Sequence, residues 1–116
     1  MNSIRNRVNL IGNLGKDPEV KEINGTPLAK FSMATTEYYK NKNGEKVEDT
    51  QWHNLAAWGN LATRAEKLLR KGDRVAIDGR LRYHSYNDKD GNNRFFSEII
   101  INEMMLISSK HDKQTV

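Results

Sequence analysis

The sequence contains no cysteine and no long apolar stretch. Without cysteine the chain can form neither a disulfide framework nor a thiolate metal site. No apolar run approaches the roughly 18–20 residues that span a bilayer. The N-terminal stretch MNSIRNRVNLIGN lacks the apolar core of a secretory signal. We therefore expect a cytoplasmic protein that does not associate with membranes.

The sequence also lacks the usual signatures of catalysis and of cofactor binding. The histidines are too scattered for a zinc-binding H-x₃₋₅-H pair: His53, His84 and His111. Asp88 and Asp90 resemble half a calcium loop, but Ile99 stands where the distal glutamate belongs, which favours turn residues. The segment GNLG, at 12–15, lacks the spacing of a dinucleotide-binding or phosphate-binding loop. No catalytic triad or carboxylate pair stands out, so we expect neither an enzyme nor a metal or other cofactor.

The length and charge of the chain point to one small, mildly basic domain. Its 116 residues, 36% of them hydrophobic, suit a single core. We expect that domain to span 1–108 and a short polar tail to span 109–116. Nineteen lysines and arginines against fifteen acidic residues give a net charge of +4. This charge alone is a weak indication of an anionic partner.

The apolar residues recur mostly with a period of two, which predicts strands. Five long strands are expected at 7–15, 28–39, 50–59, 73–86 and 94–107, with a short one before an Asn24–Gly25 turn. The segment 40–49 is expected to be a charged loop. Between the third and fourth long strands, Leu61, Ala62, Ala65, Leu68 and Leu69 share one helical face, and Gly72 follows as a stop.

The order of these elements predicts an all-β protein with one helix. A helix between the third and fourth of five strands is the arrangement of an OB-fold, a small Greek-key barrel. The alternative is a β-sandwich with one added helix. We favour the barrel because long strands interrupted by glycine can curl round a small core.

The third and fourth strands each place functional residue types on one face. Trp52, Asn54, Ala56 and Trp58 alternate with His53, Leu55 and Ala57. Both indoles could belong to the core, as large aromatics often do. In the fourth strand, however, the apolar set is Val75, Ile77, Gly79, Leu81 and Tyr83, and the other set is Arg80, Arg82, His84 and Tyr86. That second set contains no acidic residue, whereas an ordinary solvated face mixes charges of both signs.

Two adjacent tyrosines, Tyr38 and Tyr39, precede Lys40 and Lys42. Neighbouring side chains on a strand point to opposite faces, so one core cannot bury both rings. Flat rings interleaved with cations suit single-stranded nucleic acid, because unpaired bases stack on rings for ~1–3 kcal/mol each while cations follow the phosphates. Duplex DNA would instead require an element fitted to a groove.

With these residues in view, the chain resembles the bacterial single-stranded DNA-binding protein family, from about Asn6 to Leu106. Four segments in order carry the resemblance: VNLIGNLGKDPEV, ATTE, QWHNLAAWGNLA and LRKGDRVAIDGRLR. The resemblance implies an OB-fold, assembly as a homotetramer, and single-stranded DNA wrapped over strands and loops. Such a protein would act at the bacterial nucleoid, in replication, recombination and repair.

Position by position, the resemblance also implies roles for individual residues. The stacking aromatics of the family fall on Tyr39, Trp52, Trp58 and Tyr86. Its phosphate contacts fall on Arg7, Lys71, Arg82 and His84, to which the charge pattern of this sequence adds Arg80, Lys40 and Lys42. His53 matches a position near the subunit interface. Asn54 stands where some members carry a positive residue.

Family members commonly continue into a long tail with an acidic tip that docks replication and repair enzymes. The sequence here ends in KHDKQTV, without such a tip. Recruitment of those proteins by that route is therefore left open. The alternative function is an OB-fold accessory subunit, such as a primosomal protein, which acts mainly through protein contacts and needs fewer stacking residues.

Overall fold

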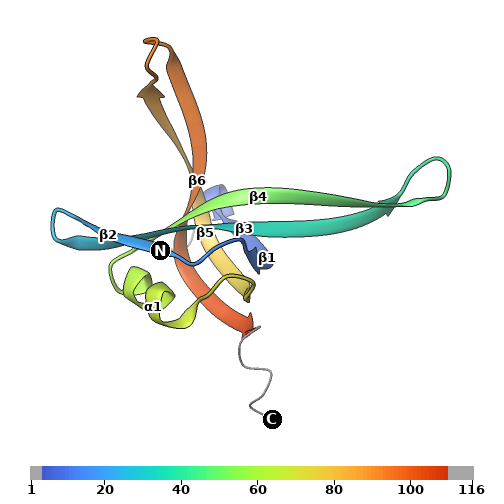
Figure 1. Ribbon diagram of the computed structural model, residues 1–116, viewed down its shortest axis with the longest axis horizontal. Coiled ribbons are helices and arrows are strands. Elements are labelled where there is room, and N and C mark those ends of the chain that lie inside the picture. The colour runs from blue at the N-terminus through green and yellow to red at the C-terminus, as the bar shows by residue number, and fades with distance from the viewer. Residues whose placement is uncertain (1–3, 110–116) are drawn as a thin grey trace.

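The computed structural model describes residues 4–109, which form one barrel with two projecting arms (Figure 1). The elements follow in this order: a 3-10 turn (Ile4–Asn6), β1 (Val8–Leu14), β2 (Glu19–Ile23), β3 (Thr26–Lys40), β4 (Lys46–Trp58), α1 (Asn60–Leu68), β5 (Arg74–Asn87) and β6 (Asn93–Ser108). The long strands, and the helix between the third and fourth of them, confirm the predicted OB-fold. The short strand β2 forms a hairpin with β3 through Asn24 and Gly25, both at positive φ as the turn requires.

Strand β1 closes the barrel by pairing with two partners. Its residues from Val8 to Asn13 pair with β5, and its end, Asn13 and Leu14, pairs with β3. Strands β1 and β3 approach so closely at Gly12 that a Cβ there would collide with the carbonyl oxygen of Ala34. On the far side of the barrel, β4 and β6 run parallel and pair through Leu55 and Ala56. The order β1-β5-β6-β4-β3 thus returns to β1.

The core lies inside the barrel and beneath the helix. Its buried members come from every long strand and from the helix: Leu14, Ala29, Phe31, Met33, Leu55, Ala57, Ala62, Ala65, Leu69, Val75, Ile77, Ile99 and Ile101. The small helical residues Ala62 and Ala65 are fully buried, so α1 packs closely over the open end of the barrel. A second, smaller buried cluster of Leu28, Ala56 and Ile100 lies on the opposite side of the sheet.

Strands β3 and β4 continue beyond the barrel as one arm, and β5 and β6 continue as another (Figure 1). The Cα radius of gyration is 16.5 Å, against about 13 Å expected for a compact domain of this length. The arms account for the difference, because two-stranded ribbons add surface without adding core. Side chains on them are exposed on both faces of the ribbon.

Three sequence-based expectations differ from the structure. The charged loop expected at 40–49 is only Asn41–Glu45, because the strands pair as far as Lys40 and Lys46. Tyr83 alternates with the core residues of β5, but it lies on the arm and is 68% exposed. Leu68 is also exposed, because α1 ends there and Leu69 turns inward in an extended conformation. Of the tail expected at 109–116, only Ser109 lies within the described residues.

Candidate nucleic-acid interface

One side of the sheet, which we call the outer face, gathers most of the candidate residues. Residues that pair directly across strands share a face. Ser32 pairs with Asn54, Arg82 with Glu98, and His84 with Phe96. Because Ala56 and Ile100 join β4 to β6 in the same alternation, these pairs form one continuous surface. The outer face comprises Lys30, Ser32, Trp52, Asn54, Trp58, Arg80, Arg82, His84, Tyr86, Phe96 and Glu98.

Both tryptophans of β4 point outward, as their alternation indicated. Trp52 is 62% exposed and Trp58 is 41% exposed. Trp58 pairs directly with Leu28 of the small second cluster, so part of its indole packs. Trp52 lies over Gly15, where an added Cβ would be only 2.5 Å from the ring atom Cζ3. A glycine on the β1–β2 connection therefore fixes how closely the Trp52 ring approaches the sheet.

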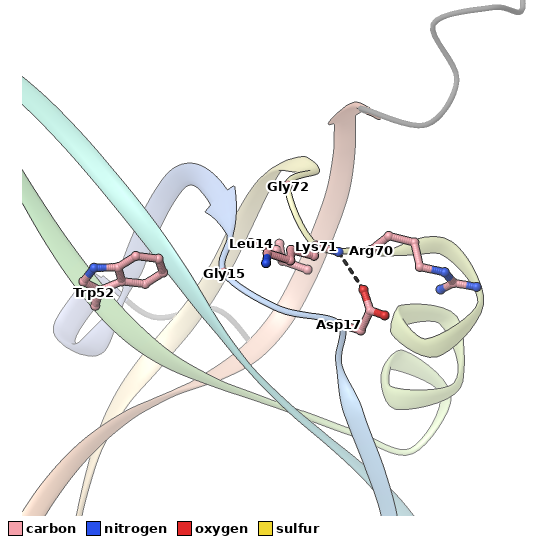
Figure 2. Close-up of a pocket in the computed structure, with 7 residues that line it drawn as sticks. All are labelled: Leu14, Gly15, Asp17, Trp52, Arg70, Lys71 and Gly72. Atoms are coloured by element: carbon pink, nitrogen blue, oxygen red, sulfur yellow. Dashed lines mark hydrogen bonds between the residues drawn. The ribbon is translucent and has the colours of Figure 1, made fainter.

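Trp52 forms one wall of a cavity of about 790 Å³, and the turn after α1 forms another (Figure 2). Lys71 lies on that turn, where its backbone N–H donates to Asp17 Oδ1 over 2.8 Å. The neighbouring Arg70 has its guanidinium turned to the helix, donating to the carbonyls of Glu66 and Leu69 over 2.7 and 2.8 Å. Lys71 thus supplies the cation on the rim of the Trp52 cavity.

The β5–β6 arm carries a cluster of rings and charges on the outer face. His84 stacks on Phe96 with 5.0 Å between ring centroids, and Tyr86 meets the same phenyl ring edge-on at 6.1 Å. His84 Nε2 lies 2.7 Å from Glu98 Oε1. On the barrel below, Arg80 donates to Asn102 Oδ1 over 3.2 Å. Arg80, Arg82 and His84, which we call the basic stripe, therefore lie along one face as predicted. Aromatic rings stand at the end of the stripe that lies on the arm.

The alternation of β5 alone had indicated a face without acidic residues. The structure shows that an acidic residue of the neighbouring strand does lie on this face. Glu98 of β6 pairs with Arg82 and is only 6% exposed. Lys30 Nζ lies 3.8 Å from its second oxygen, Oε2. The alternation of one strand cannot reveal a charge contributed by its neighbour, which is why sequence reasoning missed this carboxylate.

The candidate residues of the β3–β4 arm stand apart from the outer face. Tyr38 and Tyr39 are 59% and 55% exposed, and they point to opposite faces of the ribbon. Tyr39 pairs with Val47, five residues before Trp52 and so about 17 Å away along the strand. Lys46 lies over the Tyr38 ring, with 4.3 Å from Nζ to the centroid. Lys40 ends β3 and Lys42 lies in the loop, so both are at the tip of the arm.

Arg7 and His53 are each held by another side chain. Arg7 donates from Nε to Asp78 Oδ1 over 2.8 Å, at the start of β1. His53 is half-buried and its Nε2 lies 2.9 Å from the hydroxyl oxygen of Thr35. Burial lowers the pKa of His53, because the partly apolar surroundings disfavour the imidazolium.

Asp88 and Asp90 belong to the turn at the tip of the β5–β6 arm. Asp88 accepts hydrogen bonds from Arg94 Nε and from the backbone N–H groups of Asp90 and Asn92. The Arg94 hydrogen bond, followed by the one from Asn92, lowers the pKa of Asp88. Within residues 4–109 no group of three or more histidine, aspartate or glutamate residues is placed to hold a metal ion. The same residues include no helix long and apolar enough to cross a membrane.

Sequence reasoning missed Gly15, Lys30, Phe96 and Glu98 as members of this surface. Phe96 offered a usable signal, because Phe95 and Phe96 are adjacent, like the tyrosine pair, and cannot both be buried. Both rings are in fact partly exposed. The other three are brought to the site by pairing between strands distant in sequence, which no local pattern records.

Comparisons with known proteins identify the family. The model of the single-strand binding protein family matches residues 5–107. The chain is 40% identical to single-stranded DNA-binding protein 1 of Xylella fastidiosa (strain 9a5c), over 96% of this chain and 83% of that protein. It is 41% identical to single-stranded DNA-binding proteins of Neisseria meningitidis, over 92% of this chain but only 62% of their length.

A solved structure, that of a Plasmodium falciparum SSB complex with ssDNA, has the same fold. The match has a TM-score of 0.83 at 30% identity and covers 93% of this chain and all of the other. The family match spans nearly the whole described chain, and the relatives support the same family at about 40% identity. This chain belongs to the single-strand binding protein family.

Proposed function

We propose that this protein binds and protects single-stranded DNA, with little preference for sequence, by stacking bases on the outer face. The observation that carries the proposal is the pair of outward indoles, Trp52 and Trp58, with Lys30 on the neighbouring strand β3 and the basic residues of β5 beyond β6. A group of exposed apolar rings that is rimmed by polar side chains marks an interaction site. Unpaired bases offer flat apolar faces, and the phosphates between them need cations.

The proposed path of the strand follows the residues that the geometry connects. Lys71 and Trp52 begin it at the cavity beside the β1–β2 connection. Arg80, Arg82 and His84 continue it along β5 toward Tyr86. Tyr39, Lys40 and Lys42 add a second contact on the β3–β4 arm, where a flexible strand of nucleic acid can reach them. Arg7 contributes at the start of β1, in exchange for or in addition to its contact with Asp78.

The protein is proposed to work as a homotetramer. Strands β1, β5 and β6 also expose apolar side chains that are not part of the outer face as defined above, including Ile11, Met105 and Ile107. From Val8 to Gly12, β1 pairs only with β5 among the described strands, which leaves a sheet edge that another subunit can cover. Several grooves in one particle bind one continuous strand with greater avidity than a single groove. We place His53 near a subunit contact.

The chain acts, on this proposal, in replication, recombination and repair at the bacterial nucleoid in the cytoplasm. Protection of exposed strands by passive binding requires no catalytic group. The main competing function, an accessory subunit working through protein contacts, would leave the indoles without a nucleic-acid ligand.

The test compares single-stranded with duplex DNA on the same protein. Fluorescence anisotropy of a labelled oligo-dT is measured against protein concentration, with a duplex of equal length as competitor. We expect tight binding of oligo-dT, weak competition by the duplex, and an affinity that falls as salt rises, because cations released from the phosphates favour binding less at high salt. Equal affinity for duplex and single strand, or no binding of either, would refute the proposal.

A further inference from the structure

A second cavity on the outer face lies apart from the Trp52 cavity and is lined by a buried carboxylate. Its volume is about 390 Å³, within the ~300–1,000 Å³ of typical small-ligand sites. Strands β3, β4 and β6 form it, together with the β1–β2 connection and Glu19 of β2, whose carboxylate lies 3.2 Å from Lys16 Nζ. The lining residues that matter here are Lys16, Lys30, Ser32, Asn54, Phe96 and Glu98.

Glu98 is the buried polar group of this cavity. It is 6% exposed and it lines the cavity. His84 engages Oε1 at 2.7 Å. Lys30 Nζ is 3.8 Å from Oε2, which is beyond hydrogen-bonding distance although close enough for attraction. An ionised carboxylate has about four acceptor positions, so Glu98 keeps acceptor capacity that a buried site favours filling.

The walls of the cavity fit a flat heterocycle. Phe96 offers an apolar ring that is 38% exposed, with its position fixed by His84 and Tyr86. Asn54 and Ser32 pair across β4 and β3 and line the same cavity, where the Asn54 amide donates to the Ser97 carbonyl over 3.4 Å and Ser32 brings a hydroxyl. Lys30, 48% exposed at its side chain, supplies positive charge at the rim for a phosphate. A carboxylate at the bottom of a phosphate-binding surface would repel DNA unless something in the ligand donates to it.

We propose that this cavity is a base-binding subsite in which Glu98 accepts a hydrogen bond from the exocyclic amino group of a nucleobase. This inference rests on the proposed function and adds a base preference at one point of the path. Glutamate pairs with the N4 amino group of cytosine in known recognition of base edges. Uracil and thymine fit less well, because their N3–H lies between two carbonyl oxygens that repel a carboxylate. His84 and Lys30 hold the Glu98 carboxylate in place.

The test uses matched oligonucleotides of about 15 nucleotides, within the ~4–16 that one OB domain contacts. Oligo-dC and oligo-dU differ at the amino or carbonyl edge and have nearly the same size. With the unaltered protein we expect dC to bind about fivefold more tightly than dU, the effect of one hydrogen bond to a charged acceptor in a partly open site. Glu98→Gln should abolish or invert that ratio, because the amide can donate to uracil O4.

Glu103→Gln is the matched control, since Glu103 lies on the same strand but lines a different cavity. It should keep the dC to dU ratio of the unaltered protein. Equal affinity of the unaltered protein for dC and dU would overturn the inference, and so would a ratio that survives Glu98→Gln. If Glu98→Gln lowers the affinity for both oligonucleotides by the same factor, Glu98 acts only by positioning His84, and the inference is overturned. Should that variant fail to fold, the dC to dU comparison on the unaltered protein decides alone. Failure to bind either oligonucleotide would instead refute the proposed function itself.

Discussion

Gly15 sets the position of Trp52, the most exposed indole of the site. A methyl group at Gly15 would be 2.5 Å from Cζ3 of the ring and 3.0 Å from the hydroxyl oxygen of Ser32. Gly15→Ala must therefore displace the indole, because carbon atoms in contact normally stay more than 3.4 Å apart. We expect oligo-dT affinity to fall by several-fold with little change in thermal stability.

A double-mutant cycle separates this effect from general damage. In a Trp52→Ala background, Gly15→Ala should cost no further affinity, because the ring it displaces is absent. Independent, additive losses from the two substitutions, measured by anisotropy, would show that Gly15 acts on the strand or on the fold rather than through Trp52.

His53 should make folding stability depend on pH. Burial lowers the pKa of His53 in the folded chain, so the unfolded chain binds a proton more readily. Stability is then full above the unfolded value of about 6.5 and falls as pH drops through and below it, until the folded group also protonates. Urea unfolding at pH 8 and pH 5.5 should show the loss. His53→Gln should reduce the difference between the two pH values, and an unchanged difference would assign it to other groups.

At the scale of elements, alternation along single strands predicted much of the interface. It correctly directed Trp52, Trp58 and Arg82 outward, because these residues lie on barrel strands with one buried side. It failed for Tyr83, which lies on an arm with two exposed sides. The length of the arms was also hidden, since a polar sequence such as 40–49 suits a loop and a solvated ribbon equally well.

The basic stripe of β5 should control the salt dependence of binding. Arg82 is exposed and lies opposite Glu98 in the strand register of the outer face, so its side chain is accessible to a phosphate. If it makes one phosphate contact, Arg82→Gln should flatten the slope of log K against log salt by ~0.7. Lys67→Gln, which removes a charge from the last turn of α1, should leave the slope unchanged. A slope unaltered by Arg82→Gln would remove this residue from the proposed path.

At the scale of the whole molecule, the sequence predicted a closed barrel because five long strands and the helix appear in a recognisable order. It could not predict which side chains meet across that barrel. Glu98 and Lys30 are 68 residues apart, and Trp52 and Gly15 are 37 apart. Such meetings depend on register, which a single sequence without aligned relatives leaves unspecified. The sequence therefore predicted the basic residues of the interface but not the carboxylate of Glu98 beside them.

Assembly is the prediction that belongs to the whole molecule. Light scattering on the chain at micromolar concentration should give the mass of a tetramer, because the apolar exterior of β1, β5 and β6 needs covering. His53→Lys should weaken the assembly, since a charge would replace a half-buried ring. Lys21→Glu, a charge change on the exposed strand β2, serves as the control for altered surface charge. A monomer of the unaltered chain would contradict the proposed assembly, and an equally stable His53→Lys tetramer would remove His53 from the interface.

The central claim is that bases of single-stranded DNA stack on Trp52 and Trp58. The most direct measurement follows indole emission during oligo-dT titration of two variants, Trp52→Phe and Trp58→Phe, each of which keeps one indole. Both remaining indoles should be quenched at saturation, and replacing either residue by alanine should weaken binding by ~1–3 kcal/mol, about 5- to 150-fold. DNA binding that is confirmed by anisotropy, yet leaves the emission of both indoles unchanged, would contradict the account.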